Sequence, residues 1–129
     1  MSEDLIGAPI FEVTVSAAGS ATSVVTVAGE LDIVTAPQLL RCVAALAPPV
    51  TSRVAIDLSA VTFIDSSGIN ALRTAARSAH ARGVAAVVAA PGEHVQRVLD
   101  LVRIGDILAL EPTLASALER LGAESAPPA

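Results

Sequence analysis

The chain has 129 residues, which is enough for one domain with its own hydrophobic core but too short for two. Its hydrophobic fraction is 53%, but 26 residues are alanine, and no apolar run approaches the roughly 18 residues that a membrane-spanning helix needs. The net charge of -5, the eight basic residues spread along the chain and the absence of Trp and Tyr argue against nucleic-acid binding. We therefore expect neither a membrane nor a nucleic acid as a partner.

The two ends of the chain differ in composition from the middle. Residues 1–8 begin with an acidic stretch and lack the basic segment of a secretory signal, so a flexible N-terminus and a cytoplasmic location are expected. One domain is predicted over residues 9–121. Residues 122–129, which contain serine and two prolines, are predicted to be a flexible tail.

Strand and helix patterns alternate along this domain after an initial pair of strands. β-Branched and apolar runs predict strands near residues 9–16, 22–29, 53–58, 84–90 and 107–110. Apolar residues at helical spacing predict helices near residues 36–47, 67–81, 92–103 and 113–121. The order predicts an α/β fold with a mostly parallel five-stranded sheet, about four helices and right-handed crossovers, in which the first two strands can be antiparallel.

The run Asp65-Ser66-Ser67-Gly68 lies where the second helix must begin. Asp65, Ser66 and Ser67 are all residue types that cap helix N-termini, so the run is typical of an ordinary cap and tight turn. The same position also suits a phosphate, because the free amides and the positive dipole end of a helix stabilise anions by about 0.3–1 kcal/mol. Local chemistry leaves both interpretations open.

The sequence offers no support for an enzyme. The residues around Ser66 lack the first glycine of the Gly-x-Ser-x-Gly nucleophile motif, and neither a phosphate-binding loop nor a zinc-hydrolase motif occurs. His80 and His94 are expected on solvated helix faces rather than beside Ser66 as general bases. The single cysteine, Cys42, lies on an apolar helix face and is expected to be a core thiol, so no metal site and no cofactor are predicted.

Two segments together carry a family resemblance. The segment from Ile56 to Gly68, combined with the run from Gly29 to Leu39, closely resembles the STAS domain of bacterial anti-sigma factor antagonists. The resemblance implies that Ser66 is phosphorylated by a partner that is both an anti-sigma factor and a serine kinase. It further implies that the unphosphorylated protein binds this partner and releases sigma factor, that ATP binds to the kinase, and that a serine phosphatase resets the switch.

The resemblance also implies a partner-binding surface around Ser66. Asp32 is placed on it because the loop after the second strand lies beside the phosphorylation site in the family, although Asp32 can alternatively serve only to cap the first helix. The polar side chains of the second helix belong to this surface or form an ordinary solvated face. The expected partner-binding residues are Asp32, Thr35, Asp65, Ser66, Ser67, Asn70 and Arg73.

The third helix is similar to that of the family over Pro91 to Asp100, where Val95, Val98 and Leu99 are expected to pack inward. Near the end of this helix the family often has Gly-Leu. This chain has Arg103 and Ile104 there, followed by Gly105, so the local geometry after the helix is left open.

Two other functions share parts of this pattern. An accessory STAS subunit of an ABC-type lipid transporter has the same fold and is not phosphorylated, which makes the Asp-Ser-Ser-Gly run a mere cap. A small hydrolase is the other alternative. The intact Asp65-Ser66-Ser67-Gly68 motif favours the antagonist over the transporter subunit, and the missing nucleophile motif and general bases disfavour the hydrolase.

Overall fold

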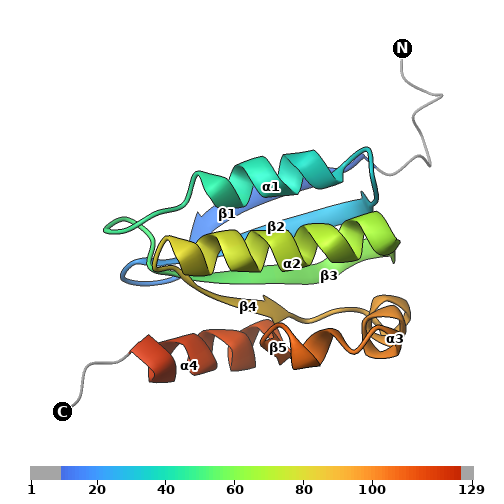
Figure 1. The fold of residues 1–129 in the computed structure, drawn as a ribbon. Helices are drawn as coiled ribbons and strands as arrows, with labels where there is room; N and C mark the ends of the chain where they lie inside the picture. Colours follow the sequence, from blue (N-terminus) through green and yellow to red (C-terminus); the bar gives the residue numbers. More distant parts are fainter. Residues whose placement is uncertain (1–9, 126–129) are drawn as a thin grey trace.

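The computed structural model describes residues 10–125, and these form a five-stranded sheet with helices on both faces (Figure 1). The strand order is β1-β2-β3-β4-β5. In chain order the elements are β1 (Glu12–Ala17), β2 (Thr22–Leu31), α1 (Ala36–Ala44), β3 (Arg53–Ile64), α2 (Ser66–Ala81), β4 (Ala85–Ala89), α3 (Glu93–Leu101), the 3₁₀ helix η2 (Ile104–Asp106), β5 (Leu110–Glu111) and α4 (Leu114–Ser125). The sheet is mixed, because β1 runs antiparallel to β2 and the other three pairs are parallel.

Two cores fill the space on either side of the sheet. The larger core joins alternate strand residues such as Val25, Ile56 and Val88 to the inner faces of α1, α2 and α3. The smaller core lies under α4 and uses small side chains, among them Ala55 and Ala117. Side chains alternate across a strand, so consecutive residues of β3 serve opposite cores. The inward packing predicted for α3 is confirmed: Val95 and Leu99 are buried, and Val98 packs partly buried against the larger core.

The element order agrees with the prediction, but several boundaries differ. The prediction that β3 ends at residue 58 is wrong, because the strand continues to Ile64. The fifth strand was expected over 107–110 and is instead the short β5, preceded by η2. Helix α1 ends earlier than predicted, at Ala44, and α4 continues to Ser125 instead of ending at 121. The predicted N-terminal segment 1–8 and the last part of the predicted tail, 126–129, lie outside the described residues.

A single arginine ties the C-terminal ends of α1 and α2 together. Arg82 follows α2, and its guanidinium donates to the carbonyl oxygens of Val43 at 2.8 Å and Leu46 at 3.0 Å. It also donates to the Ser78 carbonyl oxygen at 2.9 Å and to the Ser78 hydroxyl. The last carbonyls of a helix lack partners within the helix, so Arg82 supplies donors there, and the Val43 carbonyl oxygen also accepts from the Leu46 amide at 3.0 Å.

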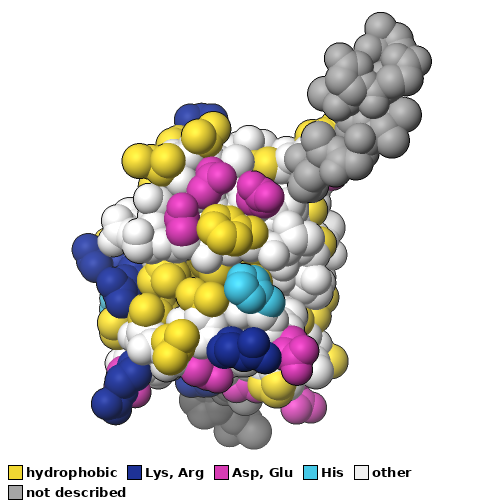
Figure 2. Space-filling model, turned by 90° about the vertical axis from the view of Figure 1, so that its right-hand side faces the viewer, with side chains coloured by type: hydrophobic (Ala, Val, Ile, Leu, Met, Phe, Trp, Pro, Cys, Tyr) yellow, Lys and Arg dark blue, Asp and Glu magenta, His cyan; other side chains and the backbone are white. Residues whose placement is uncertain are grey.

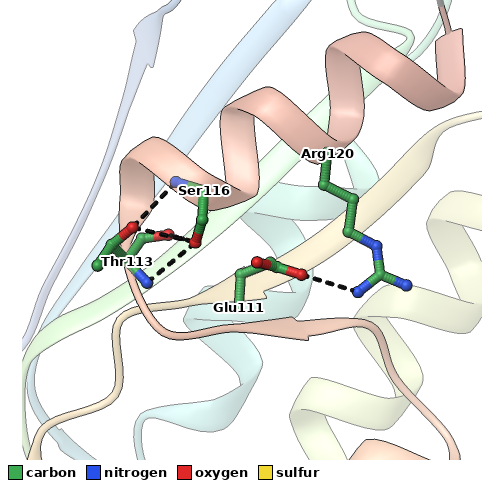
Figure 3. A network of polar contacts seen from close by, with 4 residues as sticks. All are labelled: Glu111, Thr113, Ser116 and Arg120. Atoms are coloured by element: carbon green, nitrogen blue, oxygen red, sulfur yellow. Dashed lines mark hydrogen bonds and ion pairs between the residues drawn. The ribbon is translucent and has the colours of Figure 1, made fainter.

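Helix α4 begins with a reciprocal cap (Figure 3). The Thr113 hydroxyl accepts from the Ser116 amide at 2.9 Å, and the Thr113 amide donates to the Ser116 hydroxyl at 3.3 Å. Beside this cap, Arg120 pairs with Glu111 of β5 at 3.0 Å. The cap stabilises the first turn of α4 directly after the short last strand, and the ion pair joins the middle of the helix to that strand.

The segment after α3 contains a strained residue. Arg103 has φ of 56° and ψ of 45°, the left-handed conformation that glycine adopts most readily. This is the position at which the family pattern often has glycine, and a non-glycine residue there costs roughly 1–2 kcal/mol. Arg103 also pairs with Asp106 at 2.9 Å, but the pair is largely exposed and offsets little of that cost.

Candidate functional site

The carboxyl ends of β2 and β3 lie side by side at one edge of the sheet. The last residues of the two strands, Leu31 and Ile64, are register partners. Immediately beyond them, the Asp65 amide donates to the Leu31 carbonyl oxygen at 3.4 Å. This confirms that the loops following the second and third strands meet at one edge, where parallel α/β sheets commonly place their sites.

Helix α2 starts directly from this edge with Asp65 as its N-cap. The Asp65 side chain accepts a hydrogen bond from the Gly68 amide at 3.0 Å. Of the three cap-type residues that the sequence offered, Asp65 therefore does the capping. Ser66, the first helical residue, is exposed, and within residues 10–125 its hydroxyl makes no hydrogen bond. The serine is thus presented to solvent while a neighbouring carboxylate caps the helix.

Gly68 allows α2 to approach the end of β2 very closely. A Cβ atom at this position would overlap the Leu31 carbonyl oxygen and lie 2.8 Å from Cγ1 of Ile64 and 3.0 Å from Cγ of Leu31. Real side chains do not tolerate such contacts with backbone atoms, so only glycine fits. The glycine fixes the distance between the Ser66 turn and the loop after β2.

The loop between β2 and α1 is organised by Asp32 and Thr35. Oδ1 of Asp32 accepts from the amides of Val34 at 3.0 Å and Thr35 at 3.1 Å. The Thr35 hydroxyl donates to the Glu30 carbonyl oxygen at 2.7 Å and accepts from the Asp32 amide at 2.9 Å. Both side chains are half-buried. Thr35 is the N-cap residue of α1, but its side chain makes no cap hydrogen bond, so Asp32 and Thr35 hold the loop rather than cap the helix.

This loop carries two exposed apolar residues that the sequence analysis did not select. Ile33 is 73% exposed and Val34 is 81% exposed, so neither side chain contributes much buried apolar area to the core. Figure 2 shows this end of the molecule, where acidic and apolar side chains lie beside one another. The sequence pattern that could have identified them is an adjacent apolar pair inside a loop, because such a pair fits neither strand nor helix periodicity. Exposed apolar side chains beside polar ones are typical of interaction surfaces.

The exposed loop and α2 border a shallow groove, here called the α1–α2 groove. It has a volume of about 300 Å³ and is lined by Ile33, Ala36, Pro37, Leu40, Ser67, Asn70 and Ala71. Ser67 and Asn70, both selected from the sequence, therefore face the same groove as Ile33. Arg73 does not line it and belongs to a different groove along α2.

Among the described residues, no hydrogen bond joins His80, His94 or Cys42 to Ser66. His80 follows Ser66 by almost four helical turns, which is roughly 20 Å along α2. His94 is exposed on α3. Cys42 is only partly buried, and burial raises the pKa of its thiol, which keeps it neutral and weakly nucleophilic near pH 7. Within residues 10–125, no three His, Cys, Asp or Glu residues form a group that could hold a metal ion.

The fold and the serine turn match a known family. The model of the STAS domain family matches residues 13–117, and the chain belongs to this family. In the part of the chain that the structure describes, no helix combines the length and apolar character needed to cross a membrane.

Solved structures extend the comparison. An anti-sigma factor antagonist from Mycobacterium paratuberculosis is 32% identical, with a TM-score of 0.73 over 87% of this chain and 94% of that one. The Bacillus cell fate determinant SpoIIAA in its phosphorylated form is 18% identical, with a TM-score of 0.63 over 84% and 98% of the two chains. A sulfate transporter family protein from Wolinella succinogenes is 15% identical, with a TM-score of 0.70 over 84% and 90%. At 18% and 15% identity, the SpoIIAA structure and the Wolinella succinogenes structure show only that the fold is shared.

The hydrogen bonds of Asp32 lead to a prediction about stability. Asp32→Ala removes the acceptor of two backbone amides, so we expect the free energy of unfolding to fall by about 1–2 kcal/mol. Chemical denaturation measures this loss. Asp32→Asn keeps an acceptor oxygen in the same place and is expected to lose less. Measuring partner affinity on the same variants separates the roles, because lost affinity at unchanged stability would show that Asp32 contacts the partner directly.

Proposed function

We propose that the protein is a phosphorylation-switched regulatory binding protein. When Ser66 is unphosphorylated, it binds an anti-sigma factor that is also a serine kinase, and sigma factor is released. The observation that carries this proposal is the exposed Ser66 hydroxyl, which has no hydrogen bond within the described residues because Asp65 supplies the helix cap. The similarity to an anti-sigma factor antagonist at 32% identity supports the same function.

The proposed partner-binding surface combines the Ser66 turn with the α1–α2 groove. Ile33 and Val34 provide apolar contact area, while Ser67 and Asn70 provide hydrogen-bonding groups at the edge of the groove. Such a mixture of an apolar centre and a polar rim is typical of transient protein interfaces. Asp32 and Thr35 act on this surface by holding the apolar loop in place.

Phosphorylation switches this surface through charge. A phosphate on Ser66 adds about -1.5 to -2 charges at pH 7. At the start of α2 the added anion faces unpaired amides and the positive end of the helix dipole, so the domain tolerates it. In the complex, the same charge must be desolvated against a surface that fits a neutral serine, and such a mismatch costs several kcal/mol. The partner then dissociates, and a serine phosphatase restores the binding form.

The transporter-subunit alternative needs no phosphorylation. It treats the Asp65 turn only as a cap, which leaves the exposed Ser66 hydroxyl without a role. The neighbouring genes distinguish the two functions, since a kinase or sigma factor gene supports the switch and transporter genes support the alternative.

The proposal predicts the modified residue. Incubation with a cognate anti-sigma kinase and ATP is expected to add one phosphate, on Ser66, because Ser66 is exposed whereas Ser67 is half-buried beside the α1–α2 groove. Intact mass and peptide mass spectrometry locate it. The matched variants are Ser66→Ala, which is expected to stay unmodified, and Ser67→Ala, which is expected to be modified normally. Full modification of Ser66→Ala would refute the assignment.

A further inference from the structure

A second groove runs along the other side of α2. This groove, here called the arginine groove, has a volume of about 320 Å³ and lies between the second half of α2, β4 and the segment after η2. Its lining residues are Arg73, Ala76, Arg77, His80, Ala86, Ile107, Leu108 and Ala109. Of the residues expected from the sequence to bind the partner, only Arg73 lines this groove.

The groove concentrates positive charge in an acidic protein. Two of the eight basic residues of the chain, Arg73 and Arg77, line it one helical turn apart, and no acidic residue does. The Nε atom of Arg73 is buried and has no hydrogen-bond partner among the described residues. An atom this buried is out of reach of a ligand in the groove, but neither Arg73 nor Arg77 makes a side-chain hydrogen bond or ion pair among the described residues, so both guanidinium groups are available to an acceptor. Guanidinium groups match carboxylate and phosphate oxygens best.

Apart from His80, the rest of the lining is aliphatic. Ala76, Ala86, Leu108 and Ala109 are small or branched side chains, and Ile107 is 57% exposed at the margin. No Phe, Tyr or Trp is among the lining residues, so the imidazole of His80 is the one ring in the lining on which a nucleobase can stack. A concave, mostly apolar site with a few converging polar groups is the usual form of a small-molecule site.

We propose that the arginine groove binds a small aliphatic anion, with its acidic head group on Arg73 and Arg77 and its hydrocarbon body on the aliphatic lining. The head group is a carboxylate or a phosphate, which offer the guanidinium groups the same kind of acceptor oxygens. Arg73 follows Ser66 by two helical turns on one face of α2, so a bound anion lies close to the proposed partner surface. The site itself does not depend on the proposed function.

The test uses NMR titration of the ¹⁵N-labelled full chain with octanoate and octyl phosphate. Acetate and 1-octanol are the matched probes, because one lacks the hydrocarbon body and the other lacks the charge. We expect octanoate or octyl phosphate to shift amides around Arg73, Arg77, Ala86 and Ala109, and to bind at least about 10-fold more tightly than acetate or octanol. If octanoate binds more tightly, the head group is a carboxylate; if octyl phosphate binds more tightly, it is a phosphate.

Variants then connect the binding to the groove. Arg73→Gln and Arg77→Gln are each expected to weaken binding of the stronger probe by about 10-fold or more. Ala76→Leu narrows the groove without touching the charges and is expected to weaken binding as well. The control is Arg97→Gln, which removes an exposed arginine of α3 that does not line the groove and is expected to change affinity less than about 2-fold. The amide spectrum of each variant reports whether it is folded.

Several results would overturn the proposal. One is the absence of localised shifts with either aliphatic anion. Another is acetate binding as tightly as octanoate, which would reveal a plain anion site. Tighter binding of ATP or GTP, or a response only to an acidic leucine-rich peptide, would assign the groove to another class of ligand. Because no kinase is used, these outcomes are independent of the Ser66 switch.

Discussion

Ser66→Asp is expected to weaken binding of the anti-sigma partner at least about 100-fold, or ~2.7 kcal/mol, whereas Ser66→Ala is expected to bind constitutively. The reason is that a carboxylate at an exposed first helical position imitates part of the phosphate charge at the proposed contact. Isothermal titration calorimetry with the purified partner measures the difference.

The controls for this pair of variants concern folding and position. Negative charge is favoured at a helix N-terminus, so the Tm of Ser66→Asp is expected to stay near that of the wild type. Thr74→Asp, which places the same charge farther along α2, is the positional control and is expected to bind more tightly than Ser66→Asp. A large fall in Tm together with lost binding would show unfolding instead of a switch.

The largest expected effect on stability comes from Gly68→Ala. Its added Cβ atom would overlap the Leu31 carbonyl oxygen and press on Ile64, so α2 must move away from the end of β2. We expect the free energy of unfolding to fall by about 2–3 kcal/mol, because the clash involves backbone atoms that cannot rotate away. Thermal and chemical denaturation measure this, and the expected fall in Tm is on the order of 10 °C.

Gly122→Ala provides the matched control. Gly122 lies within α4, and a Cβ atom there would meet no heavy atom within 4 Å. The same chemical change is therefore expected to stabilise the protein, by up to about 1 kcal/mol, through the higher helix propensity of alanine. Equal effects of the two substitutions would refute the close approach at Gly68.

Much of the fold could be predicted from local patterns. The alternation of β-branched runs with helical apolar spacing predicted the order of the strands and the four α-helices, because these periodicities are properties of contiguous residues. The start of α2 was predicted for the same reason, since cap-type residues directly precede its apolar face. The meeting of the β2 and β3 loops followed from parallel strands ending at one edge.

The lengths of β3 and β5 could not be predicted from local patterns. Residues Ser59 to Phe63 lack a clean strand pattern, yet β3 continues through them because β2 runs alongside and supplies hydrogen-bond partners across two irregularities in register. The last strand, β5, is short because few residues of the neighbouring strand pair with it. It pairs with only two residues of β4, so of the predicted strand 107–110 only Leu110 lies in β5, and Ile107 and Leu108 form a turn and a bend after η2.

By itself, the sequence determined the α/β architecture, the serine-bearing turn at the start of α2 and the acidic, alanine-rich character of the chain. The tertiary structure decided that Asp65 is the residue that caps α2 and that position 68 must be glycine. It also decided that Asp32 and Thr35 hold a loop and that two grooves flank α2. The physical reason is the range of the interactions. Caps and periodicity depend on neighbours in the chain, whereas close approach, strand pairing and grooves depend on residues that only folding brings together.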